Sequence, residues 1–187
     1  MATKSTELEA VNICLNVIGE ASVNSLTGTL PFEVTLARNI ISETARELCQ
    51  DSYIFNTEKD VTLSSDGTNV AVGAHIIIFK HASVNYVIRG TQLYNMDDGT
   101  LVIPADVLGT ITYLLDFEDL PEAAKRYVNI RAARVYADRL VGSKDIRAFT
   151  ERDEIEAKGQ LTHYQEGTGD FNMLSHPDVV SMLNRRI

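Results

Sequence analysis

Two groups of acidic side chains are the first residues in this sequence whose types and spacing could do chemistry. Glycoside hydrolysis needs two carboxylates, one on either side of the bond that breaks. The candidates are Asp97 with Asp98, and Asp116 with Glu118 and Asp119. The first pair precedes a glycine in a turn sequence, and the second group precedes a predicted helix, where acids cap the backbone and complement the helix dipole. The turn and the helix start explain these acids without catalysis, so we expect no enzyme, with a carbohydrate hydrolase as an alternative.

Histidines and cysteines do not have the spacing of a metal site. His75 and His81 have the same parity, so a continuous strand would put both on one face, but no third ligand is spaced to join them. Cys14 and Cys49 fall in predicted helices and are expected to be small buried side chains. The sequence has no phosphate loop, nucleophile elbow or H-E-x-x-H motif. It therefore predicts no catalytic residues, no cofactor and no metal.

Charge is unevenly distributed along the 187 residues, whose net charge is −9. Residues 51–120 hold ten acidic and three basic side chains, whereas residues 121–160 hold nine basic and seven acidic ones. Binding to nucleic acid needs clustered Lys and Arg, so we expect no specific DNA binding. No apolar run approaches the roughly 18 residues of a membrane span, and no signal peptide is evident. Synthesis in a cytoplasm is expected.

Hydrophobic periodicity predicts two helices at the beginning of the chain and two near its end. The first begins at a capping box of Thr6 and Glu9 and ends at Gly19. The others are expected at residues 32–49, 121–141 and 143–164. The last helix is highly charged, with a thin apolar stripe of Ile146, Phe149 and Ile155. We expect it to be half solvated or to face a neighbouring subunit.

The middle of the chain changes to short β-like runs separated by turn signals. These runs are expected at residues 53–55, 61–63, 70–72, 76–79, 86–88, 92–94, 100–103 and 110–116. Five or more short strands in about 65 residues predict a small antiparallel sheet or barrel-like lobe. The fold class is therefore α+β. It comprises a bundle of about four helices (residues 1–50 and 120–165), a central antiparallel β lobe (residues 51–119) and an extended C-terminal arm (residues 166–187).

The arm has many apolar side chains and no core of its own. These are Phe171, Met173, Leu174, Val179, Val180, Met182 and Leu183. A segment this short cannot bury them on itself, so we expect it to be disordered or docked on a partner.

Several stretches together resemble the tail tubular protein A family of T7-like phages. The matching residues are Glu9-Ala10-Val11-Asn12, Ile18-Gly19-Glu20, Val23-Asn24-Ser25-Leu26 with Gly28, Phe55-Asn56 with Glu58, Arg89-Gly90 followed by Leu93-Tyr94, Pro121-Glu122, and Gly169-Asp170-Phe171-Asn172-Met173-Leu174. They occur in the family's order and span nearly the whole chain. The family often has Gly-Trp before its F-N strand, where this chain has Ser52-Tyr53-Ile54, and a second glycine after R-G, where Thr91 stands.

The resemblance implies a structural virion protein of the phage tail. Family members form a dodecameric ring between the portal protein and the tail nozzle protein and extend the channel through which DNA leaves. The implied partners are therefore further copies of the chain, the portal and the nozzle, with DNA passing through unbound and no membrane. A head-completion connector is a second alternative, since such proteins also combine four helices with an arm.

Three sets of residues are expected to carry this function. The portal-binding arm would use Phe171, Asn172, Met173, Leu174, Val179, Val180, Met182 and Leu183. The subunit interface would use Arg147, Arg152, Asp153 and Glu156. The β lobe would present Arg89, Tyr94, Asp97 and Asp98 to the nozzle or the channel.

Overall fold

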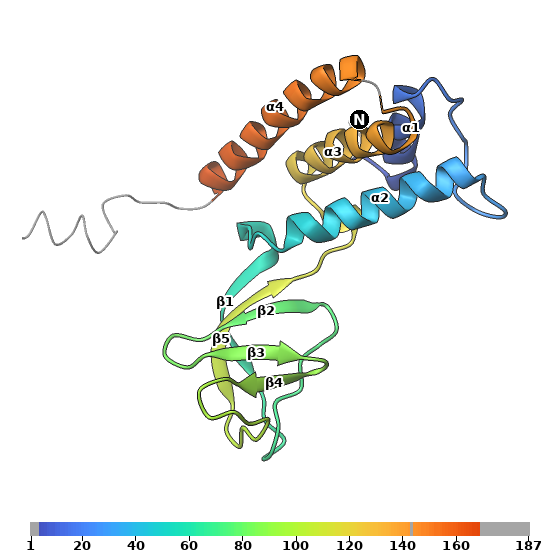
Figure 1. The fold of residues 1–187 in the computed structure, drawn as a ribbon. Helices are drawn as coiled ribbons and strands as arrows, with labels where there is room; N and C mark the ends of the chain where they lie inside the picture. Colours follow the sequence, from blue (N-terminus) through green and yellow to red (C-terminus); the bar gives the residue numbers. More distant parts are fainter. Residues whose placement is uncertain (1–3, 143, 169–187) are drawn as a thin grey trace, which may run out of the picture.

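The computed structural model describes residues 4–142 and 144–168 and confirms the α+β class. Figure 1 shows the helices gathered at one end of the molecule and the strands at the other. The helices are α1 (Glu7–Val17), α2 (Phe32–Cys49), α3 (Glu122–Leu140) and α4 (Lys144–Thr168). The strands between α2 and α3 are β1 (Thr57–Leu63), β2 (Ile76–Lys80), β3 (Tyr86–Arg89), β4 (Gln92–Asn95) and β5 (Val107–Tyr113). No helix in the described part of the chain is long and apolar enough to cross a membrane.

The signals that begin and end α1 act as predicted. The Thr6 hydroxyl accepts from the Glu9 backbone N–H, and the Glu9 carboxylate accepts from the Thr6 N–H at 3.0 Å, which completes a capping box. Gly19 follows the helix at φ +83°, a left-handed conformation that glycine adopts without steric cost. The Asn12 side chain then holds the link to α2, because its amide donates to Val23 O and its carbonyl accepts from Val23 N. Gly19 thus ends α1, and the Asn12 side chain fixes the link that leads to α2.

The core of the helical end lies where α1, α2 and α3 pack together. α3 packs on each of the other three helices, and Figure 1 shows it between α2 and α4. Many of its buried side chains are small, including Ala124, Ala132 and Ala133, which lets the helices approach closely. The largest buried side chains around them are Leu15, Ile40, Ile41 and Tyr136. Burial of this apolar surface is the main stabilising term for these helices.

Buried apolar side chains and ion pairs together set the rotation of α4 about its axis. Ala157 and Leu161 are buried, whereas Ile155, a member of the thin apolar stripe, is 70% exposed. Glu154 faces α3 and forms an ion pair with Arg134 and another, at 3.6 Å, with Arg131. Successive helical residues are about 100° apart, so turning Glu154 toward α3 turns Ile155 toward solvent. The exposed Ile155 agrees with the prediction of a half-solvated helix, whereas the sequence did not indicate the ion pairs to α3.

The β lobe contains a three-stranded antiparallel sheet in the order β1-β5-β2 and a separate β3–β4 hairpin. The hairpin turns at Gly90, which has φ +62°, and pairs Arg89 with Gln92. Residues 70–72 and 100–103, both predicted as strands, form only isolated bridges, such as Ser65 with Val70 and Asn95 with Thr100. The run 53–55 overlaps a 3₁₀ turn at Ile54–Asn56. Val70, Val72 and Ile103 belong to the lobe core, whereas Tyr53 and Phe55 pack against the helical core. These side chains are buried or partly buried without extending a sheet.

A second hydrophobic core fills the space between the sheet and the hairpin. Its buried members are Val70, Val72, Phe79, Leu93, Ile103, Val107 and Ile111. Gly109 on β5 makes room for the neighbouring strand β2, since a Cβ there would meet the Phe79 ring at 2.5 Å and Lys80 O at 2.6 Å. The helical core and this lobe core are separate clusters.

The two clusters are joined where the chain passes between the helices and the strands. Asn56, 1% exposed, donates from its amide to Cys49 O at 2.7 Å and to Tyr113 O at 3.0 Å. Cys49 ends α2 and Tyr113 ends β5, so one side chain binds both connections. Ser52 lies within 3.0 Å of the Thr112 hydroxyl nearby. The connection between helices and lobe is therefore a hydrogen-bonded junction.

Candidate assembly surfaces

The Asp97 and Asp98 carboxylates stabilise a turn, as the sequence predicted. Asp97 accepts from the Asn85 backbone N–H at 2.9 Å and from its side-chain amide at 2.7 Å, and these bonds lower the pKa of Asp97. Asp98 accepts from the Asn95 amide at 2.7 Å. Both acids follow β4: Asp97 ties the turn to the segment before β3, and Asp98 ties it to the last residue of β4. Their hydrogen-bond acceptors are used to hold backbone and amide groups.

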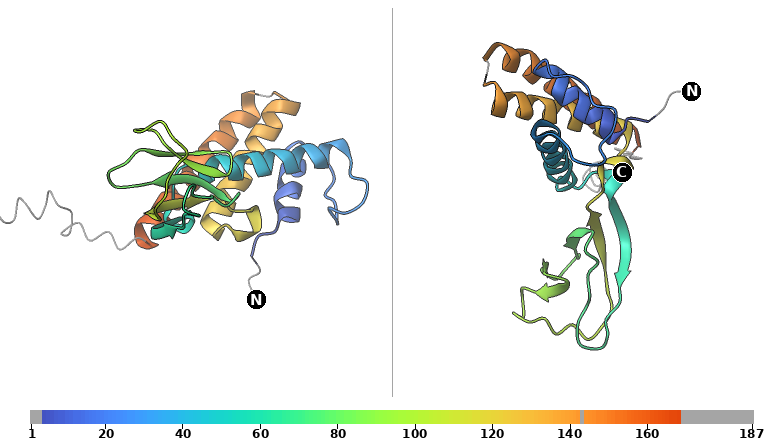
Figure 2. Two further views of the ribbon diagram at one scale, coloured as in Figure 1. Left: turned by 90° about the horizontal axis from the view of Figure 1, so that it is seen from below. Right: turned by 90° about the vertical axis from the view of Figure 1, so that its right-hand side faces the viewer.

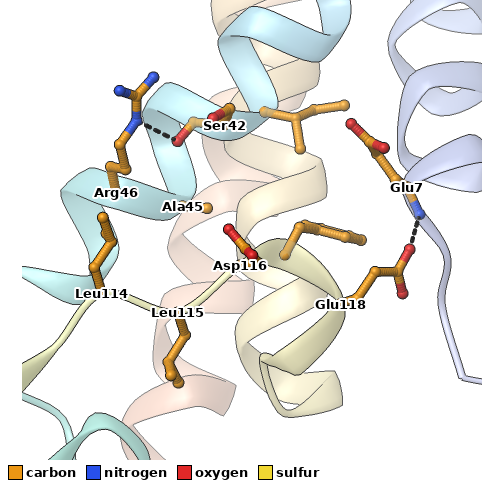
Figure 3. Close-up of a pocket in the computed structure, with 10 residues that line it drawn as sticks. Glu7, Ser42, Ala45, Arg46, Leu114, Leu115, Asp116 and Glu118 are labelled. Carbon is orange, nitrogen blue, oxygen red and sulfur yellow. Dashed lines mark hydrogen bonds between the residues drawn. The ribbon is translucent and has the colours of Figure 1, made fainter. Parts of the chain in front are cut away.

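The acids before α3 line a groove of about 440 Å³ at the junction of helices and lobe, which Figure 3 shows. Its walls come from α1, α2 and residues 114–118. Glu118 accepts from the Glu7 N–H at 2.8 Å and contacts Lys125 Nζ at 3.5 Å, and the Glu7 carboxylate binds Arg38. Of the three acids that line the groove, Glu7, Asp116 and Glu118, only Asp116 lacks a side-chain hydrogen bond or ion pair within the described chain. The groove therefore lacks a pair of free carboxylates.

A buried lysine that the sequence did not indicate, Lys125, contacts Glu118 and Phe117 in the wall of the groove. Lys125 is 1% exposed, donates from Nζ to Ser5 O at 2.9 Å and lies 5.4 Å from the centre of the Phe117 ring. A buried ammonium group needs such partners to offset its desolvation. Its place in the first turn of α3 gave no signal of burial. Its contacts fix the N-terminal residues against the segment before α3.

Histidines and cysteines have structural surroundings in the described residues. His81 Nδ1 accepts from the Ser83 and Val84 N–H groups, and His75 stacks on Tyr113 with ring centres 5.5 Å apart. No group of three or more metal-ligating side chains occurs in the described part of the chain. Burial raises the pKa of the Cys14 thiol to about 12. These side chains pack or cap turns.

The outer face of the β3–β4 hairpin brings together two residues that the sequence singled out. The Arg89 guanidinium lies 3.4 Å from the centre of the Tyr94 ring, and its Nη2 is 3.8 Å from Met96 Sδ. Val87 and Met96 beside them are 38% and 50% exposed. Arginine and tyrosine are frequent hot spots of protein interfaces. This face has the chemistry of a contact surface.

The charged face of α4 offers a second surface. Arg152, Asp153 and Glu156 are exposed, as expected for a half-solvated helix. Arg147 lies within α4, but its side chain lies outside the described part of the structure. Ile155 stands exposed among these charges. The role of this face in contacting another subunit stays a prediction.

The predicted portal-binding arm lies outside the described residues. Its residues are Phe171, Asn172, Met173, Leu174, Val179, Val180, Met182 and Leu183. Their role in binding the portal stays a prediction.

Comparison with known proteins identifies the chain. The family model for tail tubular proteins matches residues 8–171. Tail tubular protein A of Klebsiella phage KP34 is 30% identical over 151 residues, which cover 79% of this chain and 81% of that protein. The molecule is therefore a structural component of a phage tail. It belongs to the tail tubular protein family, as the resemblance in its motifs indicated.

Proposed function

We propose that this protein forms the ring-shaped adaptor that joins the portal to the tail nozzle and extends the DNA channel. Family membership over residues 8–171 is the observation that carries the proposal. The fold supports it, because the helices and the β lobe lie at opposite ends of the molecule (Figure 1). An adaptor needs two unlike ends, since it must bind a different partner on each side. A dodecamer, by resemblance to the family, is the proposed assembly.

The C-terminal arm is the proposed contact with the portal. Its apolar residues, above all Phe171, Met173 and Leu174, would act as anchors in pockets of the partner. Val179, Val180, Met182 and Leu183 would form a second patch, with Asn172 contributing an amide between them. Support comes from their number in a segment too short to bury them on itself.

The exposed charged side chains of α4 are the proposed contact between the helical parts of neighbouring subunits. A head-to-tail contact closes into a ring when its rotation divides a full turn. Arg147 and Arg152 on one subunit would meet acids such as Asp153 and Glu156 on the next. The mixed signs on one helix support this arrangement, because each subunit then carries both halves of the contact.

The β lobe is proposed to face the nozzle, the channel, or both. Ten acidic and three basic side chains in residues 51–120 give it a net negative charge. Like-charge repulsion would keep DNA from sticking as it passes, so no specific DNA binding is proposed. Arg89, Tyr94, Asp97 and Asp98 lie in this lobe.

A non-enzymatic role in the virion tail is part of the proposal, with synthesis in the host cytoplasm. It is supported by the structural roles of the acids that could have served a carbohydrate hydrolase. Asp97 and Asp98 hold a turn, and Glu118 holds Glu7 and Lys125. A head-completion connector is the neighbouring alternative, and the proteins that co-purify with the chain distinguish the two.

Assembly with purified portal protein tests the proposal. The full chain should form rings seen by electron microscopy and should attach to portal-containing heads, and attached rings should recruit the nozzle. Deletion of residues 170–187 should abolish attachment. The matched control is Lys80→Ala, at an exposed residue outside the arm and outside α4, which should form rings that still attach. Undiminished attachment of the truncated chain would exclude the arm as the portal contact.

A further inference from the structure

The β3–β4 hairpin has one face buried in the lobe core and one face open to solvent. Side chains alternate along a strand, so Leu93, which is fully buried, and its partner Ile88 face inward. Their neighbours Val87 and Tyr94, also paired, face outward together with Arg89 and Met96. These four outward residues are called the hairpin face. The apolar side chains of Val87 and Met96 and the stacked Arg89 guanidinium are not part of the lobe core.

Arg89 on this face is already held in one geometry. Its guanidinium lies over the Tyr94 ring at 3.4 Å and against Met96 Sδ at 3.8 Å. Such stacking reduces the side-chain entropy that a contact must overcome and leaves the planar donors free for a carboxylate. No ion pair joins Arg89 to an acid in the described part of the chain. It is also the single basic residue between Lys80 and Lys125 in an acidic stretch.

The opposite side of the lobe ends in strand β1, which carries exposed acids. β1 is an edge strand that pairs with β5 on one side. Glu58 and Asp60 are exposed on it, and the register shifts between Glu58 and Val61, with Asp60 at φ +58°. A bulge of this kind hinders the addition of a further strand to the edge. The edge therefore suits contact through side chains.

We propose that neighbouring β lobes of the ring contact each other head to tail, the hairpin face of one copy docking on the β1 edge of the next, with Arg89 bound to Asp60. This inference rests on the ring named as the proposed function. The right-hand view of Figure 2 shows β1 and the β3–β4 hairpin on opposite sides of the lobe. A head-to-tail contact requires two different patches placed in this way.

Charge favours a second copy of the chain as the occupant. Acidic lobes placed side by side repel each other, and a cation directed at the neighbour's acid offsets this repulsion at each contact. A basic partner would be repelled by Arg89. DNA would meet one arginine within a strongly acidic lobe, which is too little for phosphate binding.

Charge reversal and its compensation in the full chain test the contact. Arg89→Glu should weaken ring formation at least tenfold in concentration, measured by mass photometry and confirmed by electron microscopy. Adding Asp60→Lys in the same chain should restore it, because each contact then regains opposite charges. Lys80→Glu is the control, since it makes the same change of charge on an exposed lobe residue outside both patches. Asp60→Asn, which tolerates the left-handed backbone at this position, gives a milder loss without reversal.

Each outcome decides the matter, provided that circular dichroism shows every variant folded. Loss with Arg89→Glu, recovery in the double variant and normal rings with Lys80→Glu support the contact. If the wild type forms rings and Arg89→Glu forms them equally well, the proposed contact between lobes is overturned and the proposed ring stands. Equal loss with Lys80→Glu, or loss without recovery, also overturns the Arg89–Asp60 contact. If Arg89→Glu weakens binding of a double-stranded oligonucleotide and leaves rings unchanged, the face binds DNA. A wild-type chain that forms no ring, with or without portal, overturns the ring itself.

Discussion

At the residue scale, the side chain with the largest structural effect for its size is the buried amide of Asn56. It donates to the carbonyl groups that end α2 and β5, and its own Oδ1 is buried without a partner in the described residues. Polarity alone did not mark Asn56 as buried. Its one signal in the sequence was its place in the Phe55-Asn56 stretch shared with the family.

Replacing Asn56 by alanine should strip two buried carbonyl groups of their donors. Each unsatisfied buried group costs about 1–3 kcal/mol, so Asn56→Ala should lower the free energy of unfolding by about 2–4 kcal/mol. Urea denaturation measures this. Asn24→Ala is the control, because Asn24 is exposed in the link before α2 and should change stability by less than about 0.5 kcal/mol. Similar values for the two variants would contradict the role of the junction.

The buried thiol of Cys14 should make stability fall in alkaline solution. Burial raises its pKa from 9.0 to about 12, so the folded state keeps a proton that the unfolded state releases above about pH 9. This contribution is complete below pH 9 and is lost as pH rises toward 12, by about 1 kcal/mol per pH unit. Urea denaturation of the wild type and Cys14→Ala at pH 8, 9 and 10 measures it. The stability difference between them should shrink with pH, and a constant difference would refute the cause.

At the element scale, sequence patterns predicted where helices begin and end better than how they are rotated. The bounds of α2 were predicted to the residue, and the capping box placed α1. Ion pairs from Glu154 to α3 help to set the rotation of α4, together with the buried Ala157 and Leu161, and the sequence did not indicate these ion pairs because their partners are distant along the chain. Likewise, the apolar runs at 70–72 and 100–103 form no strands; they place Val70, Val72 and Ile103 in the lobe core, but Leu101 and Val102 are exposed. A short apolar run fits a core-lining loop as well as a strand.

The ion pairs of α4 lead to a prediction about its stability on α3. The side chains of Glu154 and Arg134 are 15% and 19% exposed, so removing one leaves the other partly buried and unpaired. Glu154→Ala should lower the free energy of unfolding by about 1–3 kcal/mol after allowance for solvent screening. Glu156→Ala, two residues away and exposed, should leave it unchanged. Equal effects in urea denaturation would show that α4 is held by its apolar contacts instead.

At the scale of the whole molecule, two separate cores suggest two units of stability. The division into helical part, lobe and arm came from the change of hydrophobic period along the sequence. What sequence could not supply was the junction between the parts, because its hydrogen bonds join residues such as Asn56 and Tyr113 that are distant in sequence. The candidate surfaces show the same limit: Arg89 and Tyr94 were found, but their stacking was not.

A cavity in one core should therefore affect that core more than the other. Leu93→Ala removes a fully buried side chain of the lobe and should cost about 2–5 kcal/mol locally. Hydrogen exchange should accelerate in β2 to β5 and change little in α1 to α3. Ile41→Ala in the helical core is the matched variant, with the reverse pattern expected. Equal acceleration everywhere in both variants would show a single cooperative unit.

The pairing of Thr57 with Thr112 has a consequence for how such proteins can diversify. The chain enters the lobe at Thr57 in β1 and leaves it beside Thr112 in β5. Two adjacent strands therefore connect the whole lobe to the helices. A lobe from another member could be grafted at these two positions while α1 to α4 stay as they are. Recombination between phages could then exchange the lobe and preserve the helical part.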